Sequence, residues 1–160
     1  TRQVDNKVNM FRWCEYSITA SLMHVQIALL SNITDVFSLI CIVSLTVVTM
    51  AFGALFEHVA STSNTYLSIL YIGFLPYLTV WTCIYTSIGL GATIAPAFVW
   101  AIINVVFFIE LLFGVNALLY GYKVRTWKSY EHVEYMYIVL SLSAKQLLTW
   151  IYFGGSFSLN

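Results

Sequence analysis

The feature that most constrains this chain is the stretch from Val59 to Ile109, which contains no charged residue and no histidine. A soluble domain carries about a quarter of its residues as charged side chains, so this stretch does not fit a water-exposed fold. A bilayer core of about 30 Å is crossed by roughly 20 helical residues. The stretch is therefore long enough for two membrane-spanning helices, and we place the break in the glycine- and proline-containing segment 89–96.

The rest of the chain divides by the same length criterion. Apolar residues make up 60% of the sequence and charged residues only 9%, and long apolar runs exclude a membrane β-barrel, whose strands alternate over about ten residues. Short linkers join antiparallel neighbours. We therefore predict an all-α integral membrane bundle, a single transmembrane domain over residues 1–160, with five helices at about 8–31, 36–56, 65–88, 96–120 and 133–154.

The positive charges indicate an orientation in the membrane. Six of the seven lysines and arginines lie around the start of the first span or in the linker 121–132, and an odd number of crossings puts these regions on one side. The positive-inside rule places that side in the cytoplasm and the C-terminus outside. The net charge is zero, which argues against a nucleic-acid partner. The six cations are Arg2, Lys7, Arg12, Lys123, Arg125 and Lys128.

The seventh cation, Lys145, lies in the middle of the last span. An ionisable residue there indicates a functional site, either a lysine held in an ion pair or one that forms a Schiff base with a carbonyl compound. Its candidate partner is Glu15 in the first span, and Arg12, three residues earlier, would complete a triad with both. Ser141 lies one turn before Lys145 and can donate a hydrogen bond to the carboxylate. A structural ion pair remains the alternative.

Other carboxylates are candidates for moving protons. Glu110 lies near the centre of the fourth span, where we expect it to be protonated or bonded to Asn104, Asn116 or His24. Its role is either that of a proton relay or that of a helix–helix contact. Glu57, at the end of the second span, is expected at the membrane interface and is the second relay candidate. Glu134, near the start of the last span, is expected to cap that helix.

Several residue types bear on packing. Gly53, Gly73 and Gly114 mark close approaches between helices, and Pro76 predicts a kink that widens the bundle locally. Aromatic residues are numerous, and they either wall a flat apolar ligand or pack the bundle; they are Trp13, Tyr16, Tyr77, Trp81, Phe107, Phe108, Tyr137 and Trp150. The three cysteines show no metal-ligand spacing and are expected in the apolar core; they are Cys14, Cys41 and Cys83.

Two motifs together resemble the heliorhodopsin family. They are Arg12-Trp-Cys-Glu15-Tyr-Ser17 near the start and Ser141-Leu-Ser-Ala-Lys145 in the last span. The resemblance covers the whole chain as the last five of the family's seven helices, so the sequence is expected to lack two upstream helices. It implies retinal, all-trans in the dark, bound to Lys145 as a protonated Schiff base, with Glu15 as the counterion and Ser141 beside it. The family's inverted orientation agrees with the charge pattern.

Similarity to microbial rhodopsins also implies which residues line the polyene. The positions following the counterion at helical spacing are Tyr16, Thr19, Ala20 and Met23. Further wall residues implied by the resemblance are Met50, Gly53, Trp81 and Phe108, and Arg12 belongs to the same predicted site. Glu110 is not expected in a typical member and could add a proton path.

Three functions are compatible with these sequence features. The leading hypothesis is a light-sensing photoreceptor that signals by a conformational change. The first alternative is light-driven or light-gated ion transport through Glu15, Glu57 and Glu110. The second is a retinal-free transporter or structural subunit in which Lys145 only pairs with Glu15. An enzyme is not expected, because the sequence shows no metal cluster or nucleophile–base motif. The expected partners are the lipid bilayer, retinal, a second copy of the chain and a signalling protein.

Overall fold

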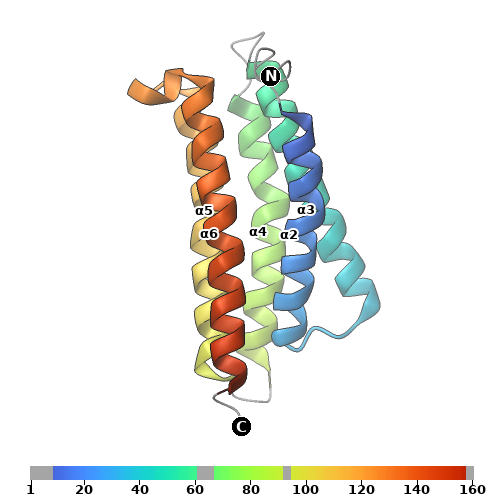
Figure 1. Ribbon diagram of the computed structural model, residues 1–160. Helices are drawn as coiled ribbons and strands as arrows, with labels where there is room; N and C mark the ends of the chain where they lie inside the picture. The colour runs from blue at the N-terminus through green and yellow to red at the C-terminus, as the bar shows by residue number, and fades with distance from the viewer. Residues whose placement is uncertain (1–8, 61–66, 92–94, 158–160) are drawn as a thin grey trace.

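The computed structural model describes residues 9–60, 67–91 and 95–157 (Figure 1). These residues form five long α-helices and one short 3₁₀ helix, and they contain no β-strand, which confirms the predicted all-α bundle. The elements are α2 (Met10–Leu30), α3 (Val36–Ala60), α4 (Leu67–Leu90), α5 (Ala97–Gly121), η1 (Arg125–Lys128) and α6 (Tyr130–Phe157).

Two helices extend beyond their predicted ends. Helix α3 continues past residue 56 to Ala60, so Glu57 lies within the helix instead of beyond its end. Helix α6 begins at Tyr130 and continues through both glycines predicted to end it. A side chain at Gly155 would collide with Phe98 of α5, so this glycine permits close packing of the two helices. The contact with α5 thus overrides the tendency of glycine to end a helix at this point of α6.

Four of the described helices are long and apolar enough to cross a membrane: α3, α4, α5 and the segment Tyr130–Gly155 of α6. Helix α2 is not among them, because its sequence includes Arg12, Glu15 and His24. It nevertheless has 21 residues and packs along α3 within the same bundle. Arg12 and His24 of α2 are buried between helices, which is where ionisable groups in a membrane bundle are expected.

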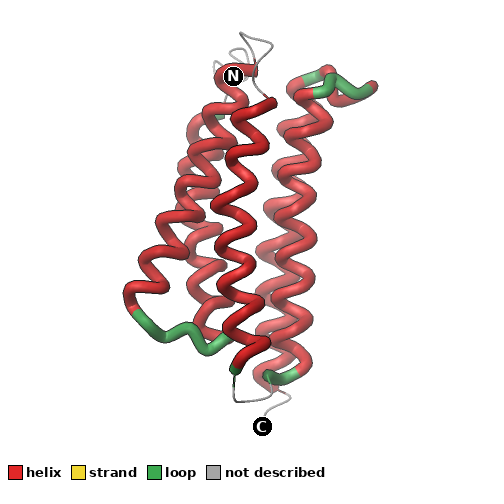
Figure 2. Tube along the Cα trace, turned by 180° about the vertical axis from the view of Figure 1, so that it is seen from behind, coloured by secondary structure: helices red, strands yellow, loops and turns green. Residues whose placement is uncertain are grey.

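The helices form two groups around a shared interior. Helix α3 packs against both α2 and α4, α5 packs against α6, and α4 has few contacts with α5. Both views show the N-terminal end of the bundle and the α5–α6 connection at one end, with the C-terminus at the other (Figures 1 and 2). This arrangement agrees with an odd number of crossings.

The predicted close approaches at three glycines are confirmed. Each glycine meets an aromatic side chain of a neighbouring helix so closely that an added Cβ would overlap it. Such contacts let helices approach without the hydrophobic effect that drives packing in water. The pairs are Gly53 with Trp13, Gly73 with Phe52, where the added Cβ would lie 2.9 Å from the side chain, and Gly114 with Phe74, where it would lie 2.5 Å away.

The prediction that the cysteines lie in the core is wrong. Cys14, Cys41 and Cys83 are all exposed on the outside of the bundle. In a membrane the lipid tails are as apolar as a protein core, so a small apolar side chain gains little by turning inward. Hydrophobicity in the sequence therefore does not predict burial for such residues.

Candidate functional site

Lys145 of α6 forms an ion pair with Glu15 of α2, with 2.5 Å between Nζ and Oε1. The predicted contact between these two residues is confirmed. The side chains are 37% and 47% exposed, respectively, and the ammonium also lies 6.0 Å from the centre of the Tyr16 ring. The pair therefore lies at the edge of the described bundle, where α6 faces α2.

Arg12 does not join this pair, so the predicted triad is wrong. Its guanidinium forms ion pairs with Glu57 of α3 and Glu134 of α6. Both of these carboxylates are more buried than Glu15. Charges attract more strongly in a low-dielectric interior than near solvent, which explains why Arg12 turns inward.

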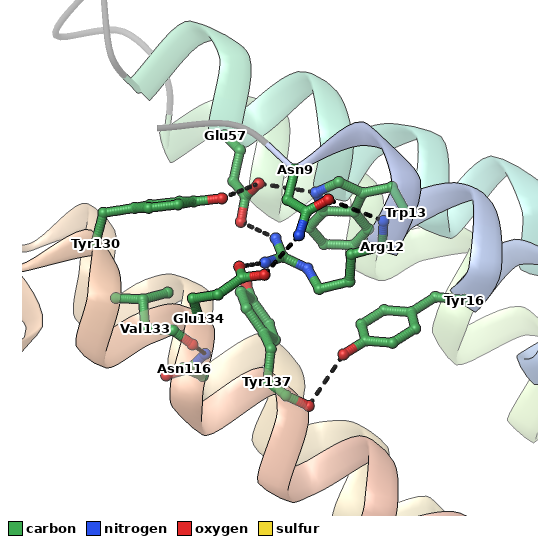
Figure 3. A network of polar contacts seen from close by, with 10 residues as sticks. All are labelled: Asn9, Arg12, Trp13, Tyr16, Glu57, Asn116, Tyr130, Val133, Glu134 and Tyr137. Carbon is green, nitrogen blue, oxygen red and sulfur yellow. Dashed lines mark hydrogen bonds and ion pairs between the residues drawn. The ribbon is translucent and has the colours of Figure 1, made fainter. Parts of the chain in front are cut away.

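Figure 3 shows that Arg12 is the centre of a buried polar network that joins α2, α3 and α6. Glu57 is 0% exposed and also accepts hydrogen bonds from Trp13 Nε1 at 2.9 Å and from the Tyr130 hydroxyl at 3.5 Å. Its burial between helices was not predicted, whereas its depth at the membrane interface stays a prediction. Helix α3 continues past Glu57, and this carries the carboxylate into the interior to meet Arg12.

Glu134 also differs from its predicted role as a helix cap. Besides Arg12, it accepts a hydrogen bond from Asn9 Nδ2 at 2.7 Å (Figure 3). Asn9 in turn caps the start of α2, since its side chain accepts from the backbone N–H of Arg12 at 3.2 Å. The start of α2 is thus tied to α6 by polar contacts.

The network reaches the interior of the bundle through two tyrosines. The Tyr137 ring lies 4.4 Å from the Arg12 guanidinium carbon, a cation–π contact. The Tyr16 hydroxyl donates to the Tyr137 carbonyl at 3.0 Å (Figure 3). Tyr16 also packs edge-on against Phe113 of α5, with 5.6 Å between ring centres. These rings separate the Arg12 network from the cavity described next.

A cavity of about 120 Å³ lies between the two groups of helices, and all five helices contribute to its wall. Its lining is almost entirely apolar. Eight of the predicted site residues line it: Tyr16, Thr19, Ala20, Met23, Met50, Gly53, Ser141 and Lys145. The structure thus brings together the residues whose grouping the sequence implied only by resemblance.

Four predicted site residues do not line the cavity. Glu15 and Arg12 lie beside it in the contacts already described. Phe108 is 58% exposed, so its predicted place in the wall is wrong. The neighbouring Phe107 turns inward instead and stacks on Tyr77, with 6.0 Å between ring centres. Trp81 is buried but contacts Glu110 instead of the cavity space.

Glu110, a predicted relay candidate, and Tyr77, a predicted candidate for the wall, also line the cavity. Other lining residues were not predicted, although the sequence contains a signal for them. On α5 the lining residues are Glu110, Phe113, Gly114 and Ala117, and on α4 they are Leu70, Gly73, Phe74 and Tyr77. Both sets follow the spacing i, i+3, i+4, i+7, which marks one face of a helix. Extending that stripe from Glu110 and from Tyr77 would have identified Phe113 and Phe74.

Glu110 bonds to His24, which is one of the three partners predicted for Glu110. Its Oε2 lies 3.1 Å from His24 Nε2 and accepts from Trp81 Nε1 at 3.1 Å. Asn104 and Asn116 are bonded elsewhere, to the carbonyls of Trp100 and Val133.

The cavity wall suits one kind of ligand. It contains a primary amine, whose charge is balanced by Glu15 beside the cavity, and its lining is otherwise apolar and aromatic. An amine in such surroundings can form a Schiff base with a carbonyl compound, and the lining favours a long apolar molecule. The donor set therefore fits an apolar aldehyde such as retinal.

Two comparisons with known proteins bear on this site. The family model described as Heliorhodopsin matches residues 1–157. No curated protein matches the chain significantly.

Proposed function

The chain belongs to the heliorhodopsin family, and on this premise we propose that it is a light-sensing photoreceptor with retinal on Lys145 as a protonated Schiff base. Membership makes it a retinal-binding, rhodopsin-like membrane protein. Retinal supplies visible absorption and light-driven isomerisation when it is bound. The observation that supports our assignment is the Glu15–Lys145 ion pair beside an apolar cavity.

Each part of the site has a distinct task in this proposal. Glu15 serves as the counterion, because its carboxylate already balances the positive charge at Lys145 Nζ. Tyr16, Met23 and Gly53 shape the wall together with aromatic residues of α4 and α5. The apolar lining lowers the local dielectric constant, which strengthens the electrostatic interaction between the charged groups. Ser141 lies one turn before Lys145 on the same wall.

Helix α2 is the element that would carry a signal away from the site. It holds Glu15, and three residues earlier it holds Arg12, whose partners lie on α3 and α6. A change of charge at Glu15 would act on a helix whose position is set by that buried network. The proposed output is a movement of α2 relative to α3 and α6, read by a signalling partner or by a second copy of the chain.

The test is the absorption spectrum of the protein reconstituted with retinal. We expect a visible band that hydroxylamine removes, and we expect Lys145→Ala to lack the band. Lys145→Arg keeps the charge opposite Glu15 but cannot form the covalent link, so it should fold and stay colourless. Lys128→Ala, an exposed cation of η1, serves as the control with a normal band. A band that persists in Lys145→Ala would overturn the assignment.

Light-driven or light-gated transport is the second candidate, and one observation favours it: Glu110 lies in the wall of the same cavity as Lys145. Glu57, in contrast, is held by Arg12 in a separate cluster. Photocurrent under voltage clamp tests this candidate. A current that is lost in both Glu15→Gln and Glu110→Gln would support transport, and absence of current in the wild-type protein would leave sensing as the function.

A retinal-free protein with a purely structural ion pair predicts a different result. Exchanging the charges, with Glu15→Lys and Lys145→Glu together, should then restore the stability lost in each single variant. This alternative would be supported if the exchanged variant regained the lost stability and if the spectrum of retinal did not change when retinal was mixed with the protein. Under our proposal the exchanged variant lacks the visible band.

We place the start of α2 and the loop 121–132 on the cytoplasmic side and the C-terminus outside. The proposal rests on Lys123, Arg125 and Lys128, which are exposed at one end of the bundle. Arg12 does not support this orientation, because its side chain is buried and paired with Glu57. Arg2 and Lys7 lie outside the described residues.

A further inference from the structure

A further ionisable pair lies in the bundle, formed by His24 of α2 and Glu110 of α5. His24 is 3% exposed, and the Glu110 side chain is 12% exposed. Glu110 also lines the cavity that holds Lys145. We propose that His24 and Glu110 together hold one proton in the cavity wall and serve as an internal proton donor to the nitrogen of Lys145.

The hydrogen bonds of Thr46 assign the tautomer of His24. The Thr46 hydroxyl donates its single proton to the Ile42 carbonyl at 2.8 Å. His24 Nδ1 lies 2.9 Å from the same oxygen, so Nδ1 must be the donor in that contact. His24 Nδ1 therefore carries a proton, and Nε2 is the nitrogen that faces Glu110.

The contact between Nε2 and Glu110 Oε2 at 3.1 Å then requires one proton. With none, an imidazole lone pair would face a buried carboxylate. With two, a buried imidazolium would face a neutral acid without a counter-charge. One proton gives either a neutral pair, with the acid O–H donating to Nε2, or an ion pair, with Nε2–H donating to the carboxylate. Both forms have the same net charge of zero.

The groups around the pair leave this count unchanged. From α4, Trp81 Nε1 donates to Glu110 Oε2 at 3.1 Å, and its ring packs edge-on against His24 with 5.5 Å between centres. Tyr77 of α4 donates its proton to the Phe107 carbonyl at 3.0 Å. Thr46 of α3 accepts from His24. From α6, the charged group on the same cavity is Lys145.

Donation from this pair balances as a simple proton transfer. The bond from the shared proton to Glu110 or to His24 breaks, a neutral nitrogen at Lys145 gains the proton, and the pair keeps one negative charge. Glu15 and His24 lie nine residues apart on α2, about 14 Å along its axis, so the transfer is not a direct contact and requires water molecules in the cavity as carriers. The role as a donor rests on the proposed function of Lys145, whereas the one-proton count does not.

The count is tested on the protein without retinal, by infrared and ¹⁵N NMR spectroscopy at about pH 6 to 8, where an ordinary histidine titrates. We expect one of two results: a protonated-carboxyl band with a neutral His24, or no such band with a doubly protonated His24. The band, if present, should vanish in Glu110→Gln and stay in Glu131→Gln, an exposed control at the start of α6. A neutral His24 without the band, or a doubly protonated His24 with it, would overturn the proposal.

The donor role is tested on the protein with retinal, by following recovery of the visible band after a flash. In the wild type we expect a recovery rate that is independent of bulk pH around neutrality. In Glu110→Gln, recovery should slow by about a hundredfold and should depend on bulk pH, because the proton must then come from solution. An unchanged rate in Glu110→Gln would refute the donor role. Absence of any visible band would instead refute the assignment of Lys145 and leave the proton count intact.

Discussion

Lys145 and Glu15 lie 130 positions apart in the sequence, and their side chains meet at 2.5 Å. The contact joins the last helix of the bundle to the first one described, beside a cavity to which all five helices contribute. It places a positive charge and its counter-charge where an apolar ligand would end.

Glu15→Gln should weaken the visible chromophore without abolishing folding. The carboxylate is the negative charge next to Lys145 Nζ, and its loss disfavours a cation at that position. We expect the visible band to disappear in an alkaline titration about one pH unit or more below the wild-type midpoint. Absorption spectra across pH measure this, with Glu131→Gln as the control. An unchanged midpoint would exclude Glu15 as the counterion.

Arg12→Gln should strongly destabilise the bundle. The substitution leaves the carboxylates of Glu57 and Glu134 without their shared cation in the interior. Breaking a buried ion pair in this way costs about 3–5 kcal/mol. Thermal unfolding in detergent measures the loss, and adding Glu57→Gln to Arg12→Gln should recover part of it. Arg125→Gln, at an exposed position of η1, should have little effect; an equal loss there would contradict the explanation.

Two glycine substitutions should act in opposite directions. In Gly53→Ala the new methyl group overlaps the Trp13 ring, and such overpacking costs about 1–3 kcal/mol. In Gly89→Ala the new methyl group meets no atom within 4 Å, so the variant should gain up to about 1 kcal/mol from helix propensity. The melting temperatures of the two variants test both predictions. Because Gly53 lines the cavity, its variant should also shift the absorption band.

Acid should loosen the start of α3 through Asp35. The backbone N–H and the hydroxyl of Ser38 both donate to Asp35 Oδ2, at 2.8 and 2.9 Å, and these bonds hold the pKa of Asp35 below its usual range. A depressed pKa means that the cap stabilises the helix at neutral pH and loses this effect as the pH falls through the folded-state pKa, below about pH 4. Hydrogen exchange of the Ser38 amide measures this loss.

Asp35→Asn is the matched variant for that experiment. Asparagine keeps an oxygen that can accept from Ser38 but does not titrate. Protection of the Ser38 amide in this variant should not change between neutral pH and about pH 3. The same acid-induced loss in Asp35→Asn would show that another group is responsible.

The orientation can be tested by labelling from outside the cell. Ser129, between α5 and α6, and Thr34, between α2 and α3, are exposed. These two connections lie at opposite ends of the bundle (Figure 1), so cysteines introduced there report on opposite sides of the membrane. A membrane-impermeant maleimide should label Thr34→Cys and spare Ser129→Cys in intact cells. The reverse pattern would invert the proposed topology. The background carries serine in place of the three exposed native cysteines, Cys14, Cys41 and Cys83.

Much of the architecture can be predicted from the sequence, because a membrane limits the choices. Apolar length sets the number of helices, and the absence of charge between Val59 and Ile109 requires two of them. The position of Lys145 within the last helix, and its spacing from Ser141, identify the candidate site. The three close-approach glycines also follow from residue size alone.

Not all partners of the ionisable residues could be predicted from the sequence. Arg12 and Glu15 are three residues apart, yet one pairs with buried carboxylates and the other with Lys145. Sequence spacing shows which residues share a helix face, but it does not show which of two competing partners lies deeper in the low-dielectric interior. That choice depends on how α2, α3 and α6 approach one another, so only the tertiary structure decides it.

The same distinction separates the core from the surface of this bundle. Hydrophobicity identifies the helices, but it cannot tell an inward Phe107 from an outward Phe108, or place Cys41 outside, since lipid and protein interior are both apolar. The sequence by itself therefore determines a membrane bundle with a lysine in its last helix. The tertiary structure decides which side chains surround that lysine, because close packing and charge pairing, and not hydrophobicity, orient the helices.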